Sequence, residues 1–180
     1  GGDKSGVERQ GAEGGEADFL AADLSRSEGV EAVFGALRRR YGALDLLVNN
    51  AGFGVAPAGA EESSIEQAQA IFDTNFMGIV RMTRAVVPHM RQQGGGRIIN
   101  MGSEAWRGTV GEANYGAAKG GVFSLTRAMA RELGRYGITA NTLCPAAATR
   151  LTLDDAVKEG FRKRLAAGLI TQERFNAVIN

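Results

Sequence analysis

Four short apolar segments, separated by helical patterns, constrain the fold of this chain more than any other feature of its sequence. They cover residues 17–23, 44–49, 96–102 and 138–144. Inside them, runs such as Leu46-Leu47-Val48 are continuously apolar and do not alternate with polar residues. Continuous apolar runs of this length predict strands that are covered on both faces, as in parallel sheets.

Helical patterns fill the intervals between these segments. Two of them start with capping-box spacings, and glycines follow the ends of two. Pro88 falls inside one pattern, where it should bend or break the helix. The expected helices follow Ser25-x-x-Glu28 up to Gly42, follow Ser63-x-x-Glu66, span 73–92 before Gly94-Gly95-Gly96, span 115–136, and follow Thr152 and Thr171.

The alternation of strands and helices predicts an α/β fold with a doubly wound parallel sheet and right-handed crossovers. Ligands of such sheets bind outside the carboxyl ends of the strands. The residues that follow the expected strands are therefore the candidates for a functional site.

The composition excludes several other classes of protein. The chain has 180 residues, which is room for one domain, and its 21 Lys and Arg against 20 Asp and Glu give no case for nucleic-acid binding. One cysteine and one histidine exclude a disulfide framework and a multi-histidine metal site. No apolar stretch reaches about 18 residues and the polar start is not a signal peptide, so we expect a cytoplasmic location with no membrane contact.

Tyr115 and Lys119 are the most informative pair among the candidates. A spacing of four places them on one face of the helix expected over 115–136. A free tyrosine is a poor base at neutral pH, and a nearby lysine cation favours tyrosinate and lowers the phenol pKa. The pair by itself also fits a surface tyrosine beside a solvated lysine.

Ser103 follows the expected strand 96–102 and adds a hydroxyl group to this pair. A phenol and a hydroxyl that converge on one substrate oxygen suit the proton transfer of carbonyl–alcohol interconversion. A serine hydrolase is excluded, because the chain lacks Gly-x-Ser-x-Gly and its single histidine is His89.

Several motifs occur together, in order, at the expected strand ends. They are Asn49-Asn50-Ala51-Gly52, Ser103, Tyr115-x-x-x-Lys119 and Pro145. With them the chain resembles the short-chain dehydrogenase/reductase family from about residue 14 to residue 151. The family has a Rossmann-like sheet. The context Pro145-Ala146-Ala147-Ala148-Thr149-Arg150-Leu151 further resembles the branch that contains bacterial (3R)-hydroxyacyl-CoA dehydrogenases.

The resemblance implies four catalytic residues. Tyr115 is the implied acid/base, Lys119 holds the nicotinamide ribose and lowers the tyrosine pKa, and Ser103 binds the substrate oxygen. Asn75, in Asp73-Thr74-Asn75-Phe76, matches the residue that supports a water-linked proton relay to the lysine. A purely structural role for Asn75, as a helix cap or at a kink, stays open.

The resemblance also implies a set of residues that bind the coenzyme, which is NAD or NADP. Asp23 resembles the acid beside the adenine ring, although it also fits an N-terminal helix cap. The Asn49 segment shapes the floor of the cleft, and a plain turn is its other interpretation. Thr149 fits a helix cap as well. The implied set is Asp23, Leu24, Asn49, Ala51, Gly52, Tyr115, Lys119, Pro145 and Thr149.

The chain departs from the family pattern in two places. The opening Thr-Gly-x-x-x-Gly-x-Gly loop, which holds the coenzyme pyrophosphate, is absent, and Asn180 stops before the last strand. We therefore expect residues 1–180 to form a single partial dinucleotide-binding and catalytic domain that lacks the N-terminal strands and the last strand of the family. Residues 152–180 are its expected substrate lid. The residues Pro145-Ala146 replace the common Pro-Gly of the family.

These observations predict an oxidoreductase that transfers a hydride between NAD(P) and a secondary alcohol or ketone. The branch resemblance points to a 3-hydroxyacyl thioester as substrate. Gly1-Gly2-Asp3 also resembles that branch, in which an Asp just before these residues favours NAD, so we lean to NAD although that position precedes Gly1. The two long helices of the family form subunit interfaces, so we expect a homodimer or homotetramer. Two alternatives stay open: a non-catalytic remnant without the pyrophosphate loop, and a lyase or epimerase that uses the same Tyr–Lys pair.

Overall fold

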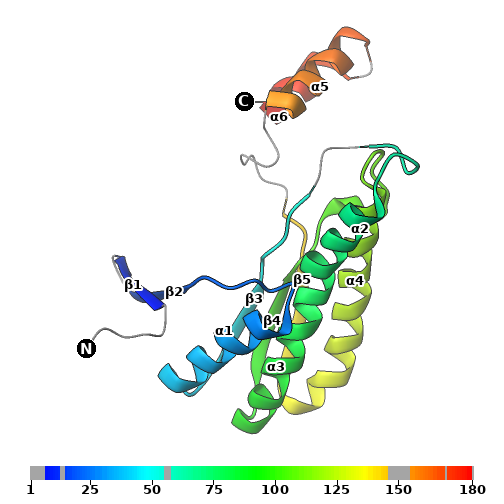
Figure 1. Ribbon diagram of the computed structural model, residues 1–180. Helices are drawn as coiled ribbons and strands as arrows, with labels where there is room; N and C mark the ends of the chain where they lie inside the picture. The colour runs from blue at the N-terminus through cyan, green and yellow to red at the C-terminus, as the bar shows by residue number, and fades with distance from the viewer. Residues whose placement is uncertain (1–6, 13–14, 55–57, 146–154, 169, 180) are drawn as a thin grey trace. The chain divides into compact units, whose positions relative to one another are not determined.

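The computed structural model describes residues 7–12, 15–54, 58–145, 155–168 and 170–179 (Figure 1). The chain divides into two compact units, Gly1–Cys144 and Pro145–Asn180, which we describe separately. The first unit holds the parallel sheet and the candidate site. The second contains helices α5 (Asp155–Ala166) and α6 (Gln172–Ile179), which are the two short helices expected after Thr152 and Thr171.

A three-stranded parallel sheet forms the centre of the first unit. Its strands are β3 (Leu46–Asn49), β4 (Gly96–Met101) and β5 (Ile138–Leu143), in the order β3-β4-β5. Leu46 pairs with Arg97, and Gly96 pairs with Ile138. The sheet confirms three of the four expected strands and the α/β fold class.

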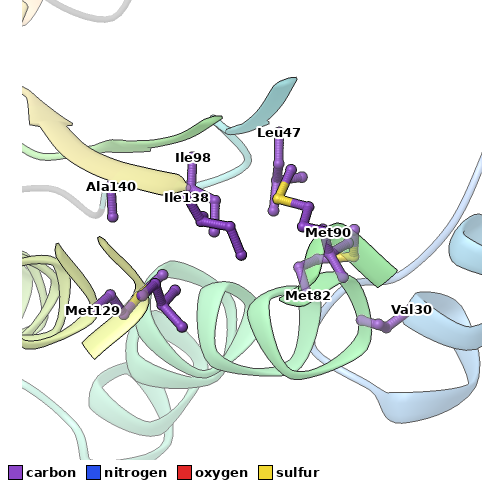
Figure 2. Close-up of a cluster of buried hydrophobic side chains, with 10 residues drawn as sticks. Val30, Leu47, Met82, Met90, Ile98, Met129, Ile138 and Ala140 are labelled. Atoms are coloured by element: carbon purple, nitrogen blue, oxygen red, sulfur yellow. The ribbon is translucent and has the colours of Figure 1, made fainter. Parts of the chain in front are cut away.

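Three helices cover one face of this sheet. They are α1 (Ser27–Arg40), α3 (Gly78–Gln93) and α4 (Ala113–Leu133). Figure 2 shows side chains of the strands pointing toward side chains of these helices. Their apolar stripes meet alternate strand residues because side chains of a strand point to opposite faces in turn. The buried cluster consists of Val30, Leu47, Met82, Val86, Met90, Ile98, Met129, Leu133, Ile138 and Ala140.

The other face of the sheet is largely exposed. Leu46 and Val48 are each 47% exposed, and Leu143 is 52% exposed. The expectation that both faces of these strands are covered is therefore wrong for the described part of the unit. The continuous apolar runs remain in the sequence, but α1, α3 and α4 all pack on the opposite face.

The first expected strand, over 17–23, does not join the parallel sheet. It forms β2 (Gly15–Leu20), which pairs antiparallel with β1 (Val7–Ala12). A strand needs a hydrogen-bonding neighbour, and among the described residues β2 finds it in the segment just before it. Asp18 contacts Arg40 and Tyr41 at the end of α1, while Phe19 is exposed.

The helix ends correct two details of the sequence interpretation. The N-cap of α1 is Arg26 and not Ser25, whose backbone N–H donates to the Asp23 carboxylate. In helix α2 (Ile65–Phe72), Ser64 is the cap, and its hydroxyl accepts from the N–H of Gln67. The caps therefore lie one residue later than the capping-box spacings predicted.

A π-helical segment, η1 (Asp73–Met77), connects α2 directly to α3. Helix α3 continues through Pro88 without a break, so the break considered for that position does not occur. It ends at Gly94, which has the left-handed conformation (φ +87°) that favours glycine at a helix C-terminus.

Two short 3-10 helices complete the first unit, η2 (Glu104–Arg107) before α4 and η3 (Gly134–Tyr136) after it. Helix η2 is important for the site because Ser103 is its N-cap. None of the described helices is both long enough and apolar enough to span a lipid bilayer.

The buried cluster generates a stability prediction. Ile98 has no exposed surface, whereas Ile65 is 78% exposed. We expect Ile98→Ala to lower the free energy of unfolding by about 2–5 kcal/mol, because it removes buried methylene groups and leaves a cavity. The matched change Ile65→Ala should alter it by less than about 0.5 kcal/mol. Urea unfolding followed by circular dichroism measures both values, and equal effects would contradict the assignment of the core.

Candidate active site

The carboxyl ends of β3 and β4 and the first turns of α4 bring the candidate residues together. Lys119, on α4, lies at the centre of this group. Its side chain is only 4% exposed, and its Nζ donates a hydrogen bond to the carbonyl oxygen of Met101 at 2.7 Å. Met101 is the last residue of β4, so this bond joins the helix to the strand end.

The ammonium group of Lys119 lies close to the ring of Tyr115. The distance from Nζ to the ring centroid is 5.7 Å, one helical turn along α4. Burial lowers the pKa of Lys119, because the charged form loses solvation. Cys144, at the end of β5, opposes part of that shift.

Ser103 is held next to the start of α4. Its Oγ accepts a hydrogen bond from the N–H of Ala105 at 3.2 Å. The carbonyl oxygen of Ala105 faces Gly116, where an added Cβ would lie only 2.6 Å from that oxygen. The glycine therefore allows η2 to approach the turn of α4 that carries Tyr115. Ser103, at the start of η2, and Tyr115, on α4, are the two residues of the site that carry a hydroxyl group.

Asn75 is fully buried in η1 and holds the loop that follows β3. Its Nδ2 donates to the carbonyl oxygen of Phe53 at 2.7 Å, and its Oδ1 accepts from the N–H of Phe53 at 2.9 Å. A Cβ on Gly52 would lie 2.8 Å from Asn75 Oδ1 and 3.7 Å from Lys119 Nζ. The side chain thus fixes Gly52 and Phe53 against the lysine and does not cap its own helix.

Asn49 and Ala51 lie on the same loop but have different surroundings. Asn49 is buried, and its Nδ2 donates to Asn100 Oδ1 at 2.9 Å. Ala51, like Gly52, is exposed. Among the described hydrogen bonds, the Asn49 side chain is therefore engaged with the interior of the sheet.

Asp23 and Leu24 lie between β2 and α1. The Asp23 carboxylate accepts hydrogen bonds from the N–H and the hydroxyl of Ser25, and these bonds lower the pKa of Asp23. Asp23 is exposed, and Leu24 is partly buried against the apolar cluster. Asp23 thus organises the turn into α1.

Pro145 is exposed and belongs to the second unit. Thr149 lies outside the described residues. The group around Lys119 is therefore described without these two residues.

Sequence reasoning missed three contributors to this site, which are the carbonyl group of Met101 and the side chains of Asn100 and Thr126. Asn100 is fully buried, and its Nδ2 donates to Thr126 Oγ1 at 2.9 Å. A signal for Asn100 was present, because it interrupts an otherwise apolar strand sequence. Thr126 carried no such signal, because a single threonine in a helix does not reveal from the sequence whether its hydroxyl group is buried.

The arrangement suits a ligand with hydroxyl groups. The Lys119 ammonium has three donors, and one of them is used by Met101. The site has a cation and a phenol one turn apart on α4, and the hydroxyl group of Ser103 at the start of η2. These groups fit the ribose and nicotinamide end of a dinucleotide. Within the described ranges, no cluster of three His, Cys, Asp or Glu residues could hold a metal ion.

Comparisons with known proteins show what the chain as a whole is similar to. The sequence model of the family described as short chain dehydrogenase matches residues 4–158. The 3-oxoacyl-[acyl-carrier-protein] reductase FabG of Vibrio cholerae is 39% identical over 127 residues, which are 70% of this chain and 52% of that protein. The 2,3-dihydroxy-2,3-dihydro-p-cumate dehydrogenase of Pseudomonas putida is 40% identical over 71% of this chain and 49% of its own length.

A solved structure is also similar to this chain. The 3-ketoacyl-(acyl-carrier-protein) reductase of Brucella melitensis, in complex with NADH, has a TM-score of 0.68 and 37% identity. The match covers 69% of this chain and 53% of that structure. The chain thus spans about half the length of the curated relatives described above.

The buried lysine predicts a specific pH dependence of stability. An unfolded lysine keeps its proton up to its ordinary pKa of 10.5, and burial lowers the pKa of folded Lys119. Between these two values unfolding takes up a proton, so the free energy of unfolding should rise with pH, by at most about 1.4 kcal/mol per pH unit for one proton. In Lys119→Met this contribution should vanish.

Urea unfolding between pH 7 and pH 10 measures the effect, with Lys158→Met as the control for a lysine outside the site. Identical pH profiles for the wild-type protein and Lys119→Met would contradict the buried charge. A similar loss of the rise in Lys158→Met would also contradict it.

Proposed function

Because the chain belongs to the short-chain dehydrogenase family, we propose that it carries the catalytic groups of an NAD(P)-dependent oxidoreductase that interconverts a secondary alcohol and a ketone. The observation that carries the proposal is the buried Lys119 ammonium, which donates to the Met101 carbonyl and lies 5.7 Å from the centre of the Tyr115 ring. Burying a cation is costly, and a reaction that needs the charge explains why it is kept there.

Tyr115 is the proposed acid and base of the reaction. In the oxidation direction its phenolic oxygen accepts the hydroxyl proton of the substrate, and in the reduction direction the phenol returns that proton to the carbonyl oxygen. Ser103 Oγ donates a hydrogen bond to the same oxygen and orients it. General acid–base catalysis of this kind contributes about 10²–10⁴-fold in rate.

Lys119 and Asn75 support this step in the proposal. Free donors of the Lys119 ammonium would hold ribose hydroxyl groups, and Asn75 fixes the loop at Gly52 against the lysine. When bound, the nicotinamide coenzyme supplies or accepts the hydride at the carbinol carbon. The further residues proposed to line its site are Asp23, Leu24, Asn49, Ala51, Pro145 and Thr149.

We propose a 3-hydroxyacyl thioester as substrate and NAD as the preferred coenzyme. The 3-oxoacyl reductase of Vibrio cholerae supports the acyl class, since its name states a 3-oxoacyl group on an acyl carrier protein. The Brucella melitensis reductase, solved with NADH, supports NAD. Steady-state rates with 3-hydroxybutyryl-CoA and with NAD against NADP test both parts, and a preference for NADP or for a diol would overturn them.

The Tyr115→Phe variant tests the acid–base role. It keeps the ring and removes only the hydroxyl group, so we expect kcat to fall by at least about 100-fold. Tyr136→Phe is the matched control, because Tyr136 stacks on Arg91 away from Lys119 and should keep its wild-type rate. NAD(P)H fluorescence during turnover of the complete gene product measures both variants.

The same assay separates the alternatives. A Tyr115→Phe variant with the wild-type rate would refute the role of the phenol. A wild-type protein that shows no change in NAD(P)H fluorescence on titration would be a non-catalytic remnant. Tightly retained coenzyme without net turnover would indicate a lyase or an epimerase.

We also propose a homodimer or homotetramer through α3 and α4. An exposed aromatic stack supports this assembly: the rings of Trp106 and Phe123 lie 4.9 Å apart, and Trp106 is 40% exposed. They line a groove of about 450 Å³ between η2 and α4, together with Arg127 and Arg131.

If α4 forms the interface, Phe123→Asp should shift the molar mass toward the monomer, because a carboxylate would be desolvated there. Val110→Asp, at an exposed residue of the loop before α4, should leave the mass unchanged. Light scattering coupled to size-exclusion chromatography measures both, and an unchanged mass of Phe123→Asp would overturn the proposed interface.

A further inference from the structure

A chain of three buried polar side chains links β3 to α4 beneath the site. Asn49 Nδ2 lies 2.9 Å from Asn100 Oδ1, and Asn100 Nδ2 lies 2.9 Å from Thr126 Oγ1. Thr126 Oγ1 lies 2.7 Å from the carbonyl oxygen of Val122, one helical turn earlier. None of the three side chains is exposed by more than 8%. Loss of one link therefore leaves a buried polar group without its partner.

The hydrogen bond between Thr126 and Val122 fixes the donor and acceptor roles in all three hydrogen bonds. The Val122 carbonyl can only accept, so the Thr126 hydroxyl donates its single proton there. Thr126 Oγ1 then accepts from Asn100, which turns the Asn100 amide so that Oδ1 faces Asn49. The three bonds form together in only one orientation of the Asn100 amide, and a buried hydrogen-bond network of this kind adds rigidity and specificity.

This series of hydrogen bonds lies next to the residues that hold Lys119. Asn100 precedes Met101, which accepts the hydrogen bond of Lys119. Thr126 follows Lys119 by seven residues, close to two turns, and therefore lies on the same side of α4. The helix is thus joined to β4 at two polar points. Sliding α4 by one residue would move it about 1.5 Å and rotate it by about 100°, which would break both.

We propose that Asn100 and Thr126 are positioning residues that set the placement of α4 and hence of Tyr115 relative to Ser103. They act through the helix and touch neither substrate nor coenzyme. The inference rests on the proposed function for its kinetic readout. A misplacement of about 1 Å at a reacting group can cost about 100-fold in rate.

The experiment compares three variants of the complete gene product. Thr126→Val keeps the shape of the side chain but removes the hydroxyl group, and we expect kcat to fall by about 10–100-fold while the KM values stay close to wild type. Thr126→Ser keeps the hydroxyl group and should restore most of kcat. Thr83→Val is the matched control, because the buried Oγ1 of Thr83 has no hydrogen-bond partner among the described residues, and should keep the wild-type kcat.

Two kinetic outcomes overturn the inference: a wild-type kcat in Thr126→Val, or an equal loss in Thr126→Ser, which would show that the methyl group matters and not the hydrogen bond. If Thr126→Val does not fold, Thr126→Cys takes its place. Its S–H group is only a weak donor, so we expect a kcat that is lower than that of Thr126→Ser but not zero. A wild-type kcat in Thr126→Cys overturns the inference.

Backbone amide exchange keeps the inference separate from the proposed function. If the wild-type protein has no dehydrogenase activity, the proposed function fails. The rate of backbone amide exchange at residues 117–123 then tests the positioning role by itself. Faster exchange there in Thr126→Val than in Thr126→Ser and Thr83→Val supports the positioning role. Equal exchange rates in the three variants overturn it.

Discussion

The buried ammonium group of Lys119 is the constraint on which the geometry of the site depends. Its hydrogen bond to the Met101 carbonyl ties α4 to the end of β4. Gly52, in the loop after β3, lies near the ammonium group, and an added Cβ there would come within 2.8 Å of Asn75 Oδ1 and 3.7 Å of Lys119 Nζ. The distance of the ammonium group from the Tyr115 ring is set by one turn of the same helix. Solvation would be the cheaper state for a lysine, so the surrounding fold must hold the charge in place.

The surroundings of the lysine show how the fold meets this cost. Polar groups near it are bound to one another, as in the reciprocal pairing of Asn75 with the Phe53 backbone. Apolar packing of Ile98 and Val86 on the same sheet supplies the stabilisation that the charge removes. Sites that keep an unfavourable group for chemistry are commonly stabilised by the rest of the structure in this way.

The sequence predicted much of the fold, because periodicity and spacing act locally. Strands β3, β4 and β5 and helices α3 and α4 lie where the apolar runs and glycines placed them, and the four-residue spacing placed Lys119 near Tyr115. It failed where a partner decides the outcome. Whether the segment containing Phe19 enters a parallel sheet depends on the strand beside it. The same apolar sequence is also compatible with an antiparallel hairpin, which is what forms here.

The Asn100 amide illustrates why the rest of the site could not be predicted. A single asparagine in an apolar strand indicates a buried hydrogen bond, but its partners come from β3 and from a helix 26 residues later. No local pattern identifies them, since the bonds depend on the register of the strands and on the rotation of α4 together. The same dependence makes the hydrogen bonds specific. Because they form in only one arrangement of β3, β4 and α4, they favour that arrangement over alternative registers of the strands and rotations of the helix.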